Sequence, residues 1–313
     1  MKTRSQNHDV PLLSIEHLSI DFLQYEKGLQ QRTTRVIDDL SLTVKAGEML
    51  AIVGSSGSGK SLLAHAVLGL LPHNATVSGA LHYQGEPLSS STLRALRGEK
   101  IALVPQSVQY LDPMMKVGKQ VRGIRGSEAA QQAVFEQYGL GPDVANLYPF
   151  ALSGGMARRV LFATALIENA ELVIADEPTP GLSHEMALEV MQNFRRLADE
   201  GRGVILITHD LDLAMQVADN IAVFYAGTIL ELAPRQDFEA GAEALRHPYS
   251  KAMIAALPQN GFMPLPGVQP CAGQHPQGCL FAPRCSQRST QCHYASVSLR
   301  PLRQGLVRCL HAT

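Results

Sequence analysis

The most constraining feature of the 313-residue chain is the segment "MLAIVGSSGSGKSLLAHAVLGLL", residues 49–71. Residues 49–54 form a short continuous apolar run, which is typical of a strand buried on both faces of a parallel sheet. Glycines and serines follow, and then apolar residues recur at helical spacing. The segment therefore predicts a buried strand, a tight loop and a helix, in that order.

The loop, "GSSGSGKS" at Gly54–Ser61, fits the pattern G-x-x-x-x-G-K-S without a departure. Glycines let backbone N–H groups and the helix N-terminus face negative charge, so this context favours phosphate binding over a turn without a ligand. Lys60 is then placed to reach the outer phosphates, and Ser61 to bind magnesium. The other loop residues predicted to bind phosphate are Gly54, Ser55, Gly57, Ser58 and Gly59.

The rest of the chain predicts an α/β fold. Residues 172–176 and 203–209 are further short apolar runs, and an amphipathic stretch at 185–200 separates them. This order is the β-α-β rhythm of a parallel sheet. Residues 12–24 and 35–48 instead alternate apolar and polar side chains, as half-buried strands do.

Composition marks two further regions and excludes several functions. Residues 116–150 predict a mostly helical insertion, and the shift to Pro, Gly, Cys and Arg after about residue 245 indicates a domain boundary. With 27 basic and 28 acidic residues, no nucleic-acid partner is expected. The apolar run at 62–72 is shorter than the roughly 18 residues of a membrane span. The polar first ten residues lack a secretory signal pattern, so we expect a cytosolic protein.

A carboxylate pair, Asp176 and Glu177, follows the apolar run at 172–175. Alone, such a pair is usually a solvated turn. Ligands of open α/β sheets bind at the carboxyl ends of strands, so after a phosphate loop Asp176 is expected to hold magnesium. Glu177 is expected to orient and polarise an attacking water.

Five motifs occur in one order: "GSSGSGKS", Gln106 in "LVPQ", "LSGGM" at 152–156, "LVIADEPT" at 172–179, and His209 in "LITHD". Over residues 12–245 the chain resembles the nucleotide-binding subunit of an ABC transporter. The resemblance implies a P-loop NTPase (RecA-like) core with a parallel sheet, an antiparallel β subdomain, a helical subdomain at about 107–160, and the ligands ATP and Mg²⁺.

The resemblance also assigns roles that isolated residues would not carry. In this family two subunits form a head-to-tail sandwich, so Ser153, Gly154 and Gly155 would complete the ATP site of a second ATPase subunit. A helix beginning there presents N–H groups suited to a γ-phosphate. Gln106 would sense magnesium and the attacking water and link the site to a membrane subunit. His209 would contact the γ-phosphate.

Met156, where glutamine is frequent, resembles the oligopeptide, dipeptide and nickel importer branch. That branch implies a transmembrane permease, an external solute-binding protein and a location at the cytoplasmic face of the plasma membrane.

Ser183 stands where the family usually has aspartate, from which we hypothesise a heterodimer with unequal hydrolysis. A weakly hydrolytic regulatory subunit and a non-transport ABC ATPase are the alternatives. Phe22 and Tyr25 are equal candidates for stacking on adenine.

Four cysteines lie in the C-terminal region 246–313: Cys279, Cys285, Cys292 and Cys309. Their loose spacing leaves an iron–sulfur cluster, zinc and free thiols open. "HPYSKAMIAALP" and "GCLFAPRC" resemble the C-terminal extension of peptide-importer ATPases, some of which carry a four-iron, four-sulfur cluster, so the resemblance favours a cluster among these alternatives. Cys271 lies outside the pattern and is expected to be unligated.

Overall fold

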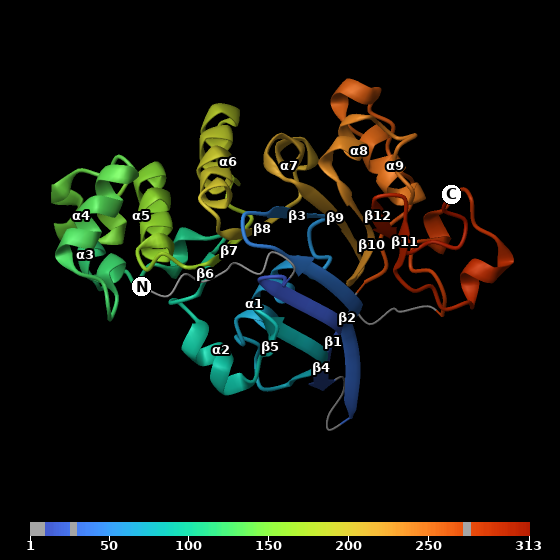
Figure 1. Ribbon diagram of the computed structural model, residues 1–313, viewed down its shortest axis with the longest axis horizontal. Coiled ribbons are helices and arrows are strands. Elements are labelled where there is room, and N and C mark those ends of the chain that lie inside the picture. Colours follow the sequence, from blue (N-terminus) through green and yellow to red (C-terminus); the bar gives the residue numbers. More distant parts are fainter. Residues whose placement is uncertain (1–9, 26–29, 272–276) are drawn as a thin grey trace.

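The computed structural model describes residues 10–25, 30–271 and 277–313. A large twisted sheet carries helices α6, α7 and α8 on one side, and α1 with a smaller sheet on the other (Figure 1). Helices α3, α4 and α5 form a lobe at one end of the large sheet, and the C-terminal segments lie at the opposite end.

The large sheet has the strand order β11-β12-β10-β9-β3-β8-β7-β6. The five strands β9, β3, β8, β7 and β6 are mutually parallel, whereas β10 joins β9 antiparallel and β11 and β12 continue antiparallel. Their bounds are β3 (Met49–Val53), β6 (Ile101–Val104), β7 (Leu172–Asp176), β8 (Gly203–Thr208), β9 (Asn220–Tyr225), β10 (Thr228–Pro234), β11 (Arg300–Leu302) and β12 (Gly305–Val307).

Every residue of β3 is buried, because helices or strands cover both faces of the sheet. Met49, Ala51 and Val53 point into the core beneath α6 and α7, and Leu50 and Ile52 point into the core shared with α1. This alternation between two cores explains why the strand is a continuous apolar run, as the sequence predicts.

The smaller sheet is antiparallel, with the order β2-β1-β4-β5. It packs across α1 and shares one apolar core with it. The expected antiparallel β subdomain is thus confirmed. Its strands are β1 (Leu13–Tyr25), β2 (Gln31–Val44), β4 (Ala75–Tyr83) and β5 (Glu86–Pro87).

The helices are short except for α6 and α5. Their bounds are α1 (Lys60–Val67), α2 (Ser90–Leu96), α3 (Val117–Arg122), α4 (Glu128–Gln137), α5 (Gly154–Leu166), α6 (His184–Asp199), α7 (Leu211–Val217), α8 (Arg235–Glu239) and α9 (Pro248–Ala255). Serine hydroxyls accept from N–H groups in the first turns of α4, α5 and α6, which fixes where these helices begin; the serines are Ser127, Ser153 and Ser183.

The insertion at 116–150 is less helical than its composition predicts. Only residues 117–122 and 128–137 are α-helical, and the rest consists of turns and short 3₁₀ segments. Gly123 and Gly139 end α3 and α4 with positive φ angles, and Pro142 and Pro149 begin 3₁₀ turns. Glycine and proline at this spacing leave room for only about two or three helical turns at a time.

The segment after residue 245 continues the large sheet. β12 pairs with β10, at Glu231 with Val307 and at Leu232 with Leu306. The same sheet therefore crosses the expected boundary, and the division of the chain at 245 stays a prediction. Within the described residues, no helix combines the length and apolar character needed to cross a membrane.

Candidate nucleotide-binding site

The phosphate loop, Gly54–Ser61, joins β3 to α1, and two of its glycines are required by geometry. Gly59 precedes α1 with a φ of 105°, a conformation that side-chain-bearing residues rarely adopt. A Cβ atom at Gly54 would lie 2.3 Å from the Phe224 carbonyl oxygen of β9. The glycines that the motif demands therefore allow both the loop's turn and its close approach to the sheet.

Lys60 lies inside this loop with only 5% of its surface exposed. Its Nζ donates to the carbonyl oxygens of Gly54 (2.8 Å) and Ser55 (3.0 Å) and lies 3.7 Å from Glu177 Oε1. Burial lowers the pKa of Lys60, and the Glu177 carboxylate opposes this shift. Ser58 Oγ is buried and has no hydrogen-bond partner in the described part of the chain. A buried cation and an unpaired hydroxyl in one loop fit the oxygen atoms of a polyphosphate.

Ser61, Asp176 and Gln106 come together from three elements, as expected. Ser61 Oγ donates to Asp176 Oδ1 at 3.0 Å. Both residues and Gln106 line one cavity of about 470 Å³, with His65 and Tyr110 among its other walls. Burial raises the pKa of Asp176, and the hydrogen bond from Ser61 opposes this. Hydroxyl, carboxylate and amide oxygens are the ligand types that Mg²⁺ takes, so the donor set fits this ion.

Glu177, which follows Asp176 in the chain, faces His209. His209 Nδ1 lies 2.7 Å from Glu177 Oε2, and the Glu177 side chain is 8% exposed against 54% for His209. Glu177 has a φ of 46°, which is unusual for a residue with a side chain. Strained conformations of this kind occur at functional sites, where surrounding structure holds them. Here the N–H of Glu177 donates to the Ile207 carbonyl at 2.9 Å.

The LSGG segment, residues 152–155, does not join this cavity. Ser153 begins α5 and accepts from the N–H of Met156 at 3.3 Å, while Ser153 and Gly154 are both exposed. The structure thus puts the serine and the first glycine at a surface-facing helix N-terminus. Ser183 likewise begins α6 and accepts from Met186 N at 3.4 Å. In this chain the serine at the expected aspartate position has a capping role.

The two adenine-stacking candidates differ in environment. Tyr25 is 64% exposed, and its hydroxyl accepts from Gln31 Nε2 at 3.0 Å. Phe22 is partly buried against the core of the smaller sheet. Neither lines the cavity that holds Ser61 and Asp176, and the choice between them stays open.

Two contacts at the site have no sequence signal. Arg158 of α5 donates to the carbonyl oxygens of Pro178 and Pro180, which ties the LSGG helix to the loop after Glu177. Ser55 Oγ donates to Gln269 Oε1 at 2.6 Å, although 214 residues separate the two. The residues in each contact belong to different segments of the chain, so no single motif pairs them.

The four cysteines converge without closing around an ion. Cys279 N donates to the Cys292 carbonyl at 2.8 Å, and Cys292 and Cys309 are buried. Burial raises the pKa values of the Cys279, Cys285 and Cys309 thiols, and neighbouring cysteines raise them further. Four buried or half-buried thiols are a donor set suited to a metal cluster. In the described residues, however, no three His, Cys, Asp or Glu side chains are arranged to hold a metal ion.

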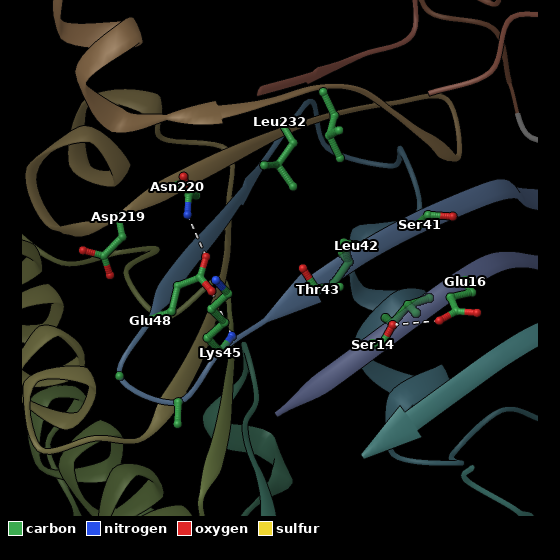
Figure 2. A pocket seen from close by; sticks show the side chains of 14 residues that line it. Ser14, Glu16, Ser41, Leu42, Thr43, Lys45, Glu48, Asp219, Asn220 and Leu232 are labelled. Carbon is green, nitrogen blue, oxygen red and sulfur yellow. Dashed lines mark hydrogen bonds between the residues drawn. The ribbon is translucent and has the colours of Figure 1, made fainter. Parts of the chain in front are cut away.

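A second cavity, of about 530 Å³, lies between the smaller sheet and the loop that follows β2 (Figure 2). Lys45, Glu48 and Asn220 point into it, and Asn220 Nδ2 donates to Glu48 Oε1 at 2.7 Å. None of the predicted site residues lines this cavity. Ser61, Asp176 and Gln106 instead line the cavity beside the phosphate loop, which is the candidate nucleotide site.

Comparison with known proteins decides the family. Residues 37–180 match the ABC transporter model, and residues 230–292 match the C-terminal region of oligopeptide/dipeptide transporters. The chain is 35% identical to the dipeptide transport ATP-binding protein DppD of Escherichia coli (strain K12), over 94% of each chain. The chain belongs to the ABC transporter ATP-binding proteins, in their oligopeptide and dipeptide branch.

Further comparisons confirm the fold and the activity of this ABC protein. It is 32% identical to the oligopeptide transport ATP-binding protein OppD of Haemophilus influenzae (strain ATCC 51907), over 91% of this chain and 92% of that one. A dimeric bacterial ABC transporter cassette superposes with a TM-score of 0.61 and 26% identity, covering 71% of this chain and 98% of that chain. A post-hydrolysis form of that cassette, bound to ADP and phosphate, also scores 0.61 at 25% identity, with the same coverage. The P-loop NTPase fold is confirmed, and the protein is an ATPase.

Proposed function

We propose that this ATPase energises the import of short peptides through a membrane permease, from the cytoplasmic face of the plasma membrane. The observation that carries the proposal is the cleft that joins the phosphate loop, Asp176 and Glu177 in a chain with dipeptide and oligopeptide transport relatives. We divide the chain into an ATPase domain, 12–245, with a helical subdomain at about 107–160, and an extension, 246–313. An external solute-binding protein delivers the peptide.

In the proposed reaction, the phosphate loop receives the triphosphate and Lys60 turns from the Gly54 and Ser55 carbonyls toward the outer phosphates. Ser61, Asp176 and Gln106 would hold Mg²⁺, which would neutralise charge at those phosphates. Glu177 orients and polarises the attacking water. His209, hydrogen-bonded to Glu177, contacts the γ-phosphate. Both side chains converge from β7 and β8, neighbouring strands of the sheet.

The exposed LSGG segment leads us to propose a second ATPase subunit. Its N–H groups at Ser153, Gly154 and Gly155 then complete the partner's nucleotide site, which explains why they have no ligand at their own. ATP closes the pair and hydrolysis reopens it, moving the helical lobe and with it the permease. Because Ser183 replaces the usual aspartate, the proposed partner is a different ATPase and the two sites hydrolyse unequally.

Glu177→Gln in the complex co-purified with its permease and partner ATPase tests the catalytic role. The amide cannot take up a proton, so turnover at that site should fall by roughly 100-fold or more, while ATP affinity stays within about twofold. Glu239→Gln at an exposed position is the matched control. Unchanged turnover by Glu177→Gln would contradict the assignment. Equal residual turnover, when the corresponding change is placed in one subunit at a time, would contradict the proposed asymmetry.

Peptide-stimulated turnover tests the substrate. The complex with its binding protein should hydrolyse ATP faster when di- or tripeptides are added. Stimulation by nickel or a metal chelate, with no response to peptides, would reassign the cargo while leaving the ATPase assignment intact.

For the extension we propose a four-iron, four-sulfur cluster held by Cys279, Cys285, Cys292 and Cys309. The burial of Cys292 and Cys309 supports it, as does the influence of neighbouring cysteines on the pKa values of Cys279, Cys285 and Cys309. Anaerobically purified protein should contain iron and acid-labile sulfide, and Cys285→Ser should lose both. Cys271→Ser is the control and should retain them. Colourless protein containing zinc would refute the cluster.

A further inference from the structure

The phosphate loop is held from outside by the C-terminal region. Ser55 Oγ donates to Gln269 Oε1 at 2.6 Å. The same residue offers its carbonyl oxygen to Lys60 Nζ at 3.0 Å. Ser55 therefore connects Gln269 on one side to the phosphate-binding lysine on the other.

Gln269 lies in an irregular segment, residues 264–271, which we call the strap. The strap has no helix or strand of its own, so side chains must hold it in place. Arg284 donates from Nε to the Pro266 carbonyl (3.0 Å) and from Nη2 to the Leu265 carbonyl (3.2 Å). Leu265 is partly buried against the main core. These contacts fix the strap three and four residues before Gln269.

Arg284 is itself anchored beside the phosphate loop. Its guanidinium carbon lies 6.0 Å from the ring centroid of Tyr225, within the range of a cation–π contact. Tyr225 is the last residue of β9, next to Phe224, whose carbonyl approaches Gly54 so closely that only glycine fits. Strap, strand end and phosphate loop are thus packed as one unit.

Tyr249 of α9 also packs at this end of β9. The Tyr249 ring packs on Tyr225 with centroids 4.7 Å apart. Burial raises the pKa of the Tyr249 phenol, and the Arg284 charge opposes this shift. The C-terminal region therefore contacts the end of β9 beside the phosphate loop through two side chains, Arg284 and Tyr249.

We propose that Gln269 is a positioning residue of the nucleotide site: by holding Ser55 it keeps the phosphate loop in the conformation that receives the triphosphate. Without this bond the loop samples other conformations, and nucleotide binding must order it. The proposal concerns ATP binding alone and does not depend on which solute is transported or on a metal in the extension.

A double-mutant cycle in the full-length protein tests the proposal. Gln269→Met keeps the side-chain length but removes the acceptor, and Ser55→Ala removes the donor. Each should raise the Kd for Mg·ATP about two- to tenfold, the range expected for one lost hydrogen bond. The double variant should bind no more weakly than the weaker single variant, because both changes break the same contact.

The KM and kcat of the assembled complex distinguish a positioning role of Gln269 from a general loss of structure. Gln269→Met should raise KM by the factor measured for Kd and change kcat by less than about twofold. Gln269→Asn, one methylene shorter, should behave in the same way, and Val268→Ala, at an exposed neighbour, should be neutral. An unchanged Kd for both Gln269 variants, with wild-type protein binding ATP normally, would overturn the proposal. The proposal would also be overturned if the factors by which Gln269→Met and Ser55→Ala raise the Kd multiplied in the double variant.

Discussion

At the scale of residues, burial lowers the pKa of two basic side chains, Lys60 and His247. Lys60 Nζ lies 3.7 Å from the Glu177 carboxylate, and this negative charge opposes the lowering of the lysine pKa. His247 is 1% exposed, and burial lowers its pKa to about 3. Its Nδ1 accepts from the Tyr249 N–H at 3.0 Å, so the neutral ring begins α9 with its proton on Nε2.

His247 should make the protein sensitive to acid. His247 binds a proton near pH 6.5 in the unfolded chain but only near pH 3 in the native state. The free energy of unfolding therefore keeps the whole contribution of the neutral ring above pH 6.5 and falls as the pH drops from 6.5 to about 3. The loss is about 1.4 kcal/mol per pH unit. His247→Asn keeps a side-chain acceptor but does not titrate. Urea unfolding at two pH values within this window should show a shallower slope for the variant.

The matched control is His184→Asn at an exposed position, which should retain the wild-type slope. If His247→Asn also retained the full wild-type slope, the buried neutral histidine would not be a source of the acid sensitivity.

At the scale of elements, a buried ion pair joins the C-terminal region to β10. Glu231 and Arg246 have side chains 0% and 1% exposed, and Arg246 Nη1 lies 3.3 Å from Glu231 Oε1. The backbone N–H groups of Arg246 and His247 each donate to the Glu231 carboxylate at 2.8 Å. Arg246 also reaches Asp237 at 2.7 Å and the Leu302 carbonyl at 2.8 Å. This network fixes where α9 and β11 meet the sheet.

Glu231→Ala should lower the free energy of unfolding by roughly 3 kcal/mol, because it leaves two buried backbone N–H groups without an acceptor and removes one of the two carboxylates that face the buried Arg246 guanidinium. Glu239→Ala, which breaks the partly exposed pair with Arg235 at 3.3 Å, should cost less than about 1 kcal/mol. Chemical denaturation of both variants measures the difference. Equal costs would show that the buried pair contributes no more than a surface pair.

At the scale of the whole molecule, the nucleotide site and an exposed apolar surface share one segment. Gln106 and Tyr110 both line the cavity beside Asp176, and Tyr110 is 66% exposed. Met114 follows at 85% exposed, next to a further cavity of about 450 Å³ that lies against α5 and is also lined by Tyr110 and Leu161. Solvent-exposed apolar side chains grouped beside a cavity are suited to docking a partner. Under the proposed function, we expect this surface to contact the permease.

Met114→Asp should weaken co-purification with the permease and lower peptide-stimulated turnover by about tenfold, since a charge would enter an apolar contact. ATP binding by the isolated subunit should stay at the wild-type level. Val77→Asp, at an exposed position on the smaller sheet, is the control. Full stimulated turnover by Met114→Asp would place the permease elsewhere.

The sequence by itself determined the elements whose signals are local. The strand at 49–53, the glycine-rich loop that follows it and the helix that begins at Ser153 depend on neighbours within a few residues, so their patterns predict them. The fold class and the cleft of Lys60, Asp176 and Glu177 follow because parallel strands bring their carboxyl ends to one edge. The helical content of 116–150 was overestimated because composition does not register where glycine and proline interrupt a helix.

Only the tertiary structure decided how distant, irregular segments meet. Three contacts join residues that no shared pattern connects. They are the pairing of β12 with β10, the hydrogen bonds of Arg158 to the loop after Glu177, and the hydrogen bond between Ser55 and Gln269. Such contacts form only after the chain has folded back on itself, and a few side chains then hold the segments together. Any polar residue in an irregular segment could serve, so no pattern singles out Gln269 until the core has placed the strap beside the phosphate loop.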